Sequence, residues 1–319
     1  MSSSPIPKKK IWLRWLLVPI FLLILAGLSN MWIQSSLDEF TTGRRSWPWG
    51  AYDSCGKSTP DKLPSKIRIG LYEEFPNPWR LAKLSQLDFP VTLAIATPSR
   101  AEFERIRVEI MATYPQVKEV VFWPVLSPEE GYYPGLWSNP QAIQRVIGES
   151  TDLPLLWDLE IPRGATAKDI RLDSGWWENR AAITDMLKSH SQPIHIWRTH
   201  VGMGLDSAFL RLLGMYIDPV AMPNARLHLD FYTTGAGQNA QELAQIMRCG
   251  VERYGERFVP SLGVLNDNEG PAEIFIPVDT LRRNLQIARD AGVSEIWLFG
   301  SNGLNPEYLD AIRTTLPVK

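Results

Sequence analysis

The sequence predicts an α/β fold, a single (β/α)8 barrel (TIM barrel) preceded by one N-terminal transmembrane helix. Three observations predict it. From residue 66 onward a short apolar or β-branched run, a loop and an amphipathic helix alternate eight times, which is the number of units in such a barrel. The chain has 319 residues, enough for the about 250 that a barrel needs. Near the N-terminus an apolar run follows three lysines, as in a signal anchor.

The repeated unit defines the predicted strands and helices. Helix signals support them: Ser99, Asn139 and Asn305 precede helices, and Gly292 follows one. An open doubly wound sheet is the alternative, but its first turn is glycine-rich, whereas residues 73–78 contain no glycine. The predicted strands are Lys66–Glu74, Val91–Thr97, Glu119–Val125, Leu153–Ile161, Pro193–Thr199, Arg226–Tyr232, Phe258–Asn266 and Ser294–Gly300. The predicted helices are Trp79–Leu87, Arg100–Tyr114, Pro140–Glu149, Trp177–Ser189, Ser207–Met215, Asn239–Tyr254, Asp279–Ala291 and Pro306–Thr315.

The N-terminal region divides the chain into four parts. Residues 1–10 form a basic cytoplasmic stub, 11–33 a transmembrane signal anchor, 34–65 a tether and 66–319 the barrel domain. Counting from Ile11, with Arg14 reaching the interface, gives the length that a span needs. The lysines at 8–10 predict a single-pass protein with its C-terminal barrel on the extracytoplasmic side of the membrane. A cleaved secretion signal is the alternative.

Charge and cysteine content narrow the function classes. A formal net charge of -2, without a basic stretch interleaved with aromatics in the barrel, argues against nucleic acid as a partner. The two cysteines, Cys55 and Cys249, both fall toward the N-terminal face of the barrel. A disulfide is one expectation in an oxidising compartment, and two unpaired buried thiols are the other.

Strand parity predicts which side chains face the barrel axis. Outward positions meet the helices and are bulky and apolar, so the alternate positions point inward. Active sites in this fold lie at the C-terminal ends of the strands, and carboxylates that converge there differ in pKa, as acid/base hydrolysis of a glycosidic bond requires. The inward polar side chains at these ends are Glu74, Asp158, Glu160, Asp230, Tyr232 and Asp267, with His228 below them.

Aromatic side chains accompany these carboxylates. Tyr72, Trp123, Trp197 and Trp297 are predicted to face the barrel interior, and adjacent Trp176 and Trp177 end a long loop. Flat aromatic faces suit the apolar faces of sugar rings. The combination predicts a polysaccharide or oligosaccharide as the substrate and needs no cofactor or metal.

Four of these residues resemble chitinase-like barrels, a glycoside hydrolase family. They are Asp158 and Glu160 ending the fourth strand, Tyr232 in the sixth and Trp297 in the eighth. The resemblance implies that Glu160 is the general acid and that Asp158 orients the substrate's acetamido group. It also implies that Tyr232 assists in catalysis and that Trp297 forms the floor of the sugar-binding site. Two further family aspartates are replaced by Leu153 and Leu156.

Other interpretations remain open. A second glycosidase pattern pairs the fourth and seventh strands and would use Glu269. A metal-dependent hydrolase or isomerase would use Glu160, His195, His228 and Asp230 as ligands, although the first strand has no His-x-His. A non-catalytic sugar-binding barrel would use the aromatics alone. A phosphate-binding barrel would rely on residues 300–303, which are more typical of a turn.

Overall fold

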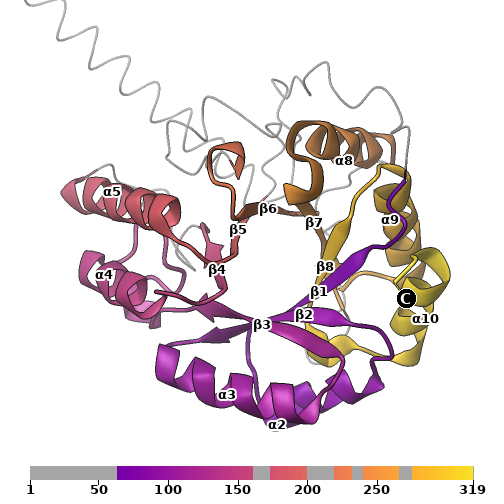
Figure 1. Ribbon diagram of the computed structural model, residues 1–319, viewed down its shortest axis with the longest axis horizontal. Coiled ribbons are helices and arrows are strands. Elements are labelled where there is room, and N and C mark those ends of the chain that lie inside the picture. The colour runs from indigo at the N-terminus through magenta and orange to yellow at the C-terminus, as the bar shows by residue number, and fades with distance from the viewer. Residues whose placement is uncertain (1–62, 161–172, 200–218, 232–239, 266–274, 319) are drawn as a thin grey trace, which may run out of the picture. The chain divides into compact units, whose positions relative to one another are not determined.

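The eight predicted strands form one closed parallel barrel. The computed structural model describes residues 63–160, 173–199, 219–231, 240–265 and 275–318. The strands pair in sequence order from β1 to β8, and β8 pairs with β1 (Figure 1). They are β1 Arg68–Glu73, β2 Val91–Thr97, β3 Val117–Pro124, β4 Leu155–Asp158, β5 Ile194–Thr199, β6 Ala225–Asp230, β7 Phe258–Val264 and β8 Glu295–Phe299. The predicted (β/α)8 barrel is confirmed.

Helices follow the strands and surround the barrel in Figure 1. The described helices are α2 Pro78–Leu81, α3 Arg100–Thr113, α4 Pro140–Glu149, α5 Ser174–Ser189, α8 Ala240–Tyr254, α9 Val278–Asp290 and α10 Pro306–Thr315. Ser99, Asn139 and Asn305 accept backbone N–H groups at the starts of α3, α4 and α10, and Gly292 after α9 has φ 83°. These helix signals are confirmed. The predicted helix Ser207–Met215 lies outside the described residues.

Most predicted elements have slightly different bounds in the structure, and two differ for reasons that their contacts explain. The first helix is one turn, α2, followed by the 3-10 helix η1 (Ala82–Gln86). Its buried leucines, Leu81, Leu84 and Leu87, are spaced by three, the period at which 3-10 side chains align. The fourth strand ends at Asp158 rather than Ile161 because the Asp158 side chain, and not a neighbouring strand, accepts the Glu160 N–H at 3.1 Å.

Alternating strand residues build two separate cores, as strand parity predicts. In β4, Leu155 and Trp157 point outward into the core between strands and helices, and Leu156 points inward. The interior core consists of Tyr72, Ala94, Ala96, Val121, Trp123, Leu156, Trp197, Val259 and Trp297. The predicted inward position of Trp123 is confirmed.

A glycine in β1 makes room for the largest interior side chain. A Cβ on Gly70 would lie 2.0 Å from Cε2 of Trp297. That indole cannot move aside, because the rings of Tyr72, His195 and His228 lie 4.8 to 5.1 Å from it between centroids. The close approach of Gly70 and Trp297 therefore fixes how β1 and β8 fill the barrel.

The N-terminal region is outside the described residues, including the predicted anchor and tether. Within the described ranges no helix is long and apolar enough to cross a membrane. Cys249 in α8 is buried and disulfide-bonded. Cys55, the other cysteine of the chain, lies outside the described residues.

The glycine pair Gly70 and Gly148 tests the interior packing. We expect Gly70→Ala to lower the free energy of unfolding by about 3 kcal/mol, because overpacking a filled core strains it. Gly148→Ala is the control, since nothing lies within 4 Å of a Cβ added there on α4, and alanine stabilises a helix by about 0.5–1 kcal/mol. Urea denaturation measures both. Equal effects of the two substitutions would contradict this packing.

Candidate functional site

Carboxyl groups gather at the C-terminal end of the barrel. Asp158 ends β4 and is 1% exposed, and Asp230 ends β6 and is 8% exposed. Glu160 and Glu74, which follow β4 and β1, are partly exposed. Glu160, Glu74 and Asp230 all lie close enough to Asp158 for their charges to raise the pKa of its carboxyl. The structure thus brings together four of the six polar residues predicted for this site.

The environment of Asp158 favours its protonated form. Burial raises the pKa of its carboxyl well above the ordinary value, and the negative charge of Glu160 raises it further. The hydrogen bond from the Glu160 N–H acts in the opposite direction but is the smaller effect. Asp158 and Glu160 are therefore two neighbouring carboxyls, one buried and one reachable by solvent.

The loop between β3 and α4 covers this cluster. The Tyr132 hydroxyl donates a hydrogen bond to Glu74 Oε1, and burial together with the charges of Glu160, Asp158 and Glu74 raises the pKa of Tyr133. Tyr132 has φ 62°, a conformation that non-glycine residues rarely adopt and that is often retained at functional sites. A Cβ on Gly135 would lie 2.7 Å from the Glu160 carbonyl oxygen, so this loop packs directly on the Glu160 backbone.

Two predicted aromatic residues lie in the barrel wall near this end. Trp123 on β3 is 4% exposed, and its ring meets those of Tyr72 and Phe299 edge-on. Among the described residues no acceptor binds the buried Trp123 Nε1. Trp197 on β5 is 7% exposed and pairs in register with Asp158. Both indoles are close to the carboxyl cluster, although neither is an open platform.

Three other predicted binding residues are placed differently from expectation. Trp297 is fully buried over Gly70, so it fills the barrel and does not floor a sugar site. Trp176 is 2% exposed because it packs in the core between α5 and the strands. Tyr72 is buried, and its hydroxyl is bound to His228 Nδ1 at 2.6 Å and to Ser261 Oγ at 2.7 Å. Trp177, by contrast, is 56% exposed.

Some predicted residues lie outside the described part of the chain. These are Tyr232 and Asp267, together with Glu269 of the second glycosidase pattern. Their roles stay predictions.

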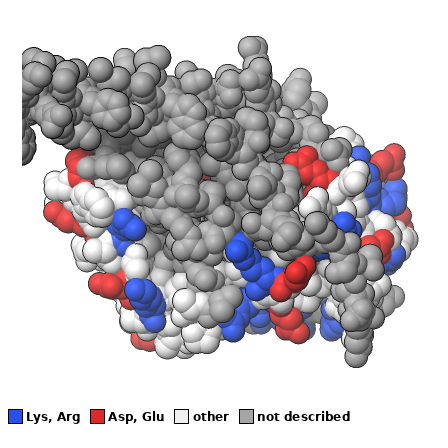
Figure 2. Space-filling view, turned by 90° about the horizontal axis from the view of Figure 1, so that it is seen from above, with Lys and Arg blue, Asp and Glu red and all other residues white. Residues whose placement is uncertain are grey.

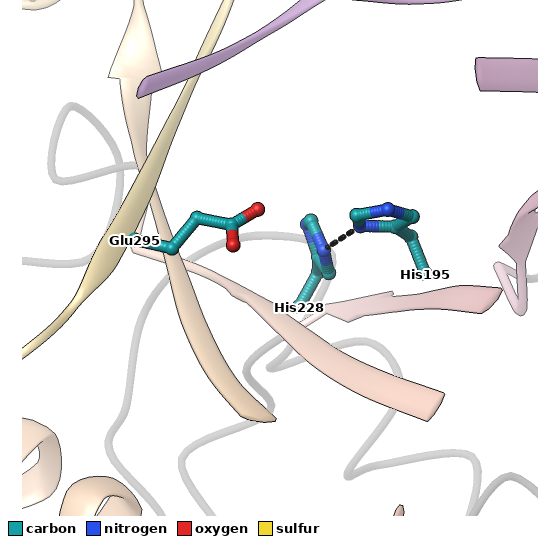
Figure 3. Close-up of side chains that lie close together, drawn as sticks. All are labelled: His195, His228 and Glu295. Carbon is teal, nitrogen blue, oxygen red and sulfur yellow. Dashed lines mark hydrogen bonds between the residues drawn. The ribbon is translucent and has the colours of Figure 1, made fainter. Parts of the chain in front are cut away.

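Below the carboxyl cluster, a hydrogen-bonded chain runs along the barrel interior. Tyr72 links to His228, and His228 Nε2 links to His195 Nδ1 at 2.7 Å (Figure 3). Glu295 of β8 points toward the two imidazoles, and one ligand atom from each of the three side chains lies within 4.8 Å of the others. This is the only group of potential metal ligands among the described residues, and it differs from the predicted set, because Glu160 and Asp230 lie above it.

The surroundings of Glu295 favour a structural network over a metal site. Its Oε2 accepts hydrogen bonds from Arg68 Nε at 3.0 Å and from Arg226 Nη1, and its Oε1 accepts one from Trp297 Nε1 at 2.7 Å. Both carboxylate oxygens are thus engaged, and two guanidinium groups repel a cation. The same cations help burial to lower the pKa of His195 to about 3.

Two buried polar residues were missed from the sequence. Glu73 is fully buried and accepts hydrogen bonds from Ser301 Oγ at 2.6 Å and from the Phe75 N–H at 3.0 Å. Ser261 binds the Tyr72 hydroxyl. Strand parity directs Glu73 away from the barrel axis, so parity did not mark it as a site residue. The one available indication was that a carboxylate buried at this position is costly unless it is paired. Residues 301–303 form the 3-10 turn η6. The Ser301 hydroxyl donates to the Glu73 carboxylate, whose negative charge disfavours phosphate at this turn.

Charges on the described surface are mixed. On the face that Figure 2 shows, basic and acidic side chains of described residues lie among one another. This arrangement differs from the basic stripe by which proteins bind a nucleic-acid backbone.

The barrel is shared with solved structures of low sequence identity. No family model matches the chain, and no curated protein matches it. A GH5 family lichenase from Caldicellulosiruptor is 12% identical with a TM-score of 0.48, covering 81% of this chain and 98% of that one. A GH18 chitinase from Pseudoalteromonas aurantia is 12% identical with a TM-score of 0.47, covering 78% and 100%. An Escherichia coli aldolase is 12% identical with a TM-score of 0.34, covering 73% and 75%. These likenesses concern the barrel fold alone, and activity does not follow from them.

The buried histidines predict a loss of stability in acid. Burial is the main cause that lowers the pKa values of His195 and His228 in the folded chain, whereas both titrate near 6.5 when unfolded. As the pH falls below about 6.5 the unfolded chain binds protons that the folded chain does not, and each histidine costs about 1.4 kcal/mol per pH unit. We expect His195→Asn to reduce the slope of unfolding free energy against pH by about that amount between about pH 6 and 5. An unchanged slope would contradict the neutral buried pair.

Proposed function

We propose that this chain is a membrane-anchored glycoside hydrolase-like protein that acts on extracellular or cell-envelope polysaccharide by carboxylate acid/base catalysis. The observation that carries the proposal is the pair formed by buried Asp158 and partly exposed Glu160, with the pKa of Asp158 raised. Hydrolysis of a glycosidic bond needs one carboxyl that keeps a proton and another that is ionised. A pair of neighbouring carboxyls in unequal environments supports this chemistry.

Glu160 is the proposed general acid, because its side chain is the one of the pair that a substrate can reach. It protonates the leaving glycosidic oxygen. Asp158 is its buried neighbour. Because burial and like-charge repulsion disfavour a second negative charge, the pair retains one proton, which Asp158 holds at rest and which reaches the leaving oxygen through Glu160. Glu74, oriented by Tyr132, and Asp230 are the remaining candidates for the ionised partner. Tyr232 and Asp267 would complete the site as assistant and binding residue.

The substrate class rests on the aromatic residues around this cluster. Trp123 and Trp197 line the wall, and Trp177 is exposed on the first turn of α5. The buried Trp123 N–H has no acceptor within the described part of the chain, which costs about 1–3 kcal/mol unless another group accepts it. A sugar hydroxyl is such an acceptor, so carbohydrate suits both the rings and the unpaired donor.

The proposed location is the outer side of a membrane. Residues 11–33 would anchor the chain, and the lysines at 8–10 would remain in the cytoplasm. The disulfide-bonded state of Cys249 supports an oxidising compartment for the barrel, since such bonds are rare in the cytosol.

A glycan screen with the purified full chain tests the proposal. We expect the wild type to release reducing ends from at least one polysaccharide, and Glu160→Gln to lose this activity by about a hundredfold or more, because general acid catalysis contributes that much. Glu109→Gln is the control, since Glu109 is an exposed side chain of α3 that pairs with Arg105. Equal product traces for the wild type and Glu160→Gln on every glycan would rule out Glu160 as the acid. Binding of a glycan without any product would instead favour a non-catalytic sugar-binding barrel.

A further inference from the structure

An exposed aromatic pair lies beside the carboxyl cluster on the turn between β1 and α2. Phe75 and Trp79 are each 48% exposed. Isolated exposed apolar side chains are ordinary, but these two share one cation. The Arg80 guanidinium carbon lies 5.4 Å from the centre of the Phe75 ring and 5.1 Å from that of Trp79. We call Phe75, Trp79 and Arg80 the β1–α2 platform.

Buried contacts hold this platform in place. Arg80 Nη1 pairs with Glu73 Oε1 at 3.4 Å, and Glu73 is itself fully buried and bound to Ser301. Asn77 caps α2 by accepting the Arg80 N–H at 3.1 Å, and Pro78 fixes the first helical position. A surface that is already ordered loses little conformational entropy when it binds a ligand.

The charge of the platform is compensated. Glu73 neutralises Arg80, so the exposed surface offers aromatic area without a net positive charge. An anionic ligand would gain little from Arg80 and would approach Glu74, the next residue before Phe75. A neutral polyhydroxylated ring matches this chemistry, because its apolar C–H face packs on the exposed aromatic rings.

A related group, in which one of the two aromatic side chains is exposed, lies elsewhere on the rim. Near the start of α5, the Arg180 guanidinium carbon lies 5.2 Å from the ring centre of Trp176 and 5.5 Å from that of the exposed Trp177. Figure 1 shows α2 and α5 on different sides of the barrel. Because helices begin at the C-terminal end of the strands in this fold, both platforms lie at the end that carries the carboxyl cluster.

We infer that the β1–α2 platform binds a sugar unit remote from the cleaved bond, so that the substrate is a chain of several sugar units lying across the mouth of the barrel. This inference rests on the proposed function and specifies its substrate. Subsites of this kind make affinity depend on chain length, because only a long chain reaches the platform while it occupies the carboxyl cluster.

Binding as a function of chain length tests the inference. Calorimetry would compare di- and hexasaccharides of the cello-, manno- and chito- series on the full chain carrying Glu160→Gln, which prevents turnover. We expect Trp79→Ala to weaken hexasaccharide binding about tenfold, the equivalent of one stacking contact, and to leave disaccharide binding unchanged. Trp79→Phe should retain most of the hexasaccharide affinity. Val108→Ala, at a 64% exposed position on α3, is the control.

The possible results separate this inference from the proposed function. Equal hexasaccharide affinities with and without Trp79→Ala would overturn the platform and leave the proposed function intact. If the Glu160→Gln protein that retains Trp79 binds none of the saccharides, both the platform and the proposed function are overturned. The Trp79→Ala variant is not needed to reach that result. An equal loss of di- and hexasaccharide affinity would place Trp79 in the cleavage site and also contradict a remote subsite.

Discussion

The interior of an eight-stranded barrel must be filled by its own side chains, and in this chain a hydrogen-bonded column does much of that work. Tyr72, His228 and His195 form one continuous chain, and Glu295 below them is held by two arginines and Trp297. Each buried polar group in this column has a partner, so the desolvation cost of placing it there is offset. Gly70 leaves the space that the Trp297 indole occupies.

This packing separates the barrel into a structural part and a reactive part. The column engages the Tyr72 hydroxyl, both ring nitrogens of His228, Nδ1 of His195 and both carboxylate oxygens of Glu295. The layer above differs, because Asp158 is buried next to Glu160, and the charges of Glu74 and Asp230 act on it as well. Among the described residues, the charged groups that act on the Asp158 carboxyl are all acidic, so no nearby cation offsets the cost of burying it. Groups that destabilise the folded chain are commonly retained for function.

The barrel was predictable from the sequence because its signals are local and periodic. Alternation within strands such as Val91–Thr97 was enough to assign the inward face, and Asn139-Pro140 marked a helix start to the residue. The depth of each inward side chain along the barrel axis was not predictable from the sequence. Trp297 and Trp123 have the same parity, yet one fills the barrel and the other lies near its mouth, because depth depends on the stagger between strands. Glu73 escaped notice because its partner Ser301 is 228 residues away.

The most direct test of the account is the pH dependence of stability in Asp158→Asn, with Asp152→Asn in the exposed turn before β4 as the control. The folded pKa of Asp158 is raised, so above about pH 4 the unfolded chain releases this proton while the folded chain retains it. The account predicts that Asp158→Asn becomes more stable than the wild type by about 1.4 kcal/mol for each pH unit above about 4, until the folded carboxyl itself ionises. The histidines are common to both proteins and cancel. A stability difference that does not change with pH, or a wild type that is the more stable at neutral pH, would contradict it.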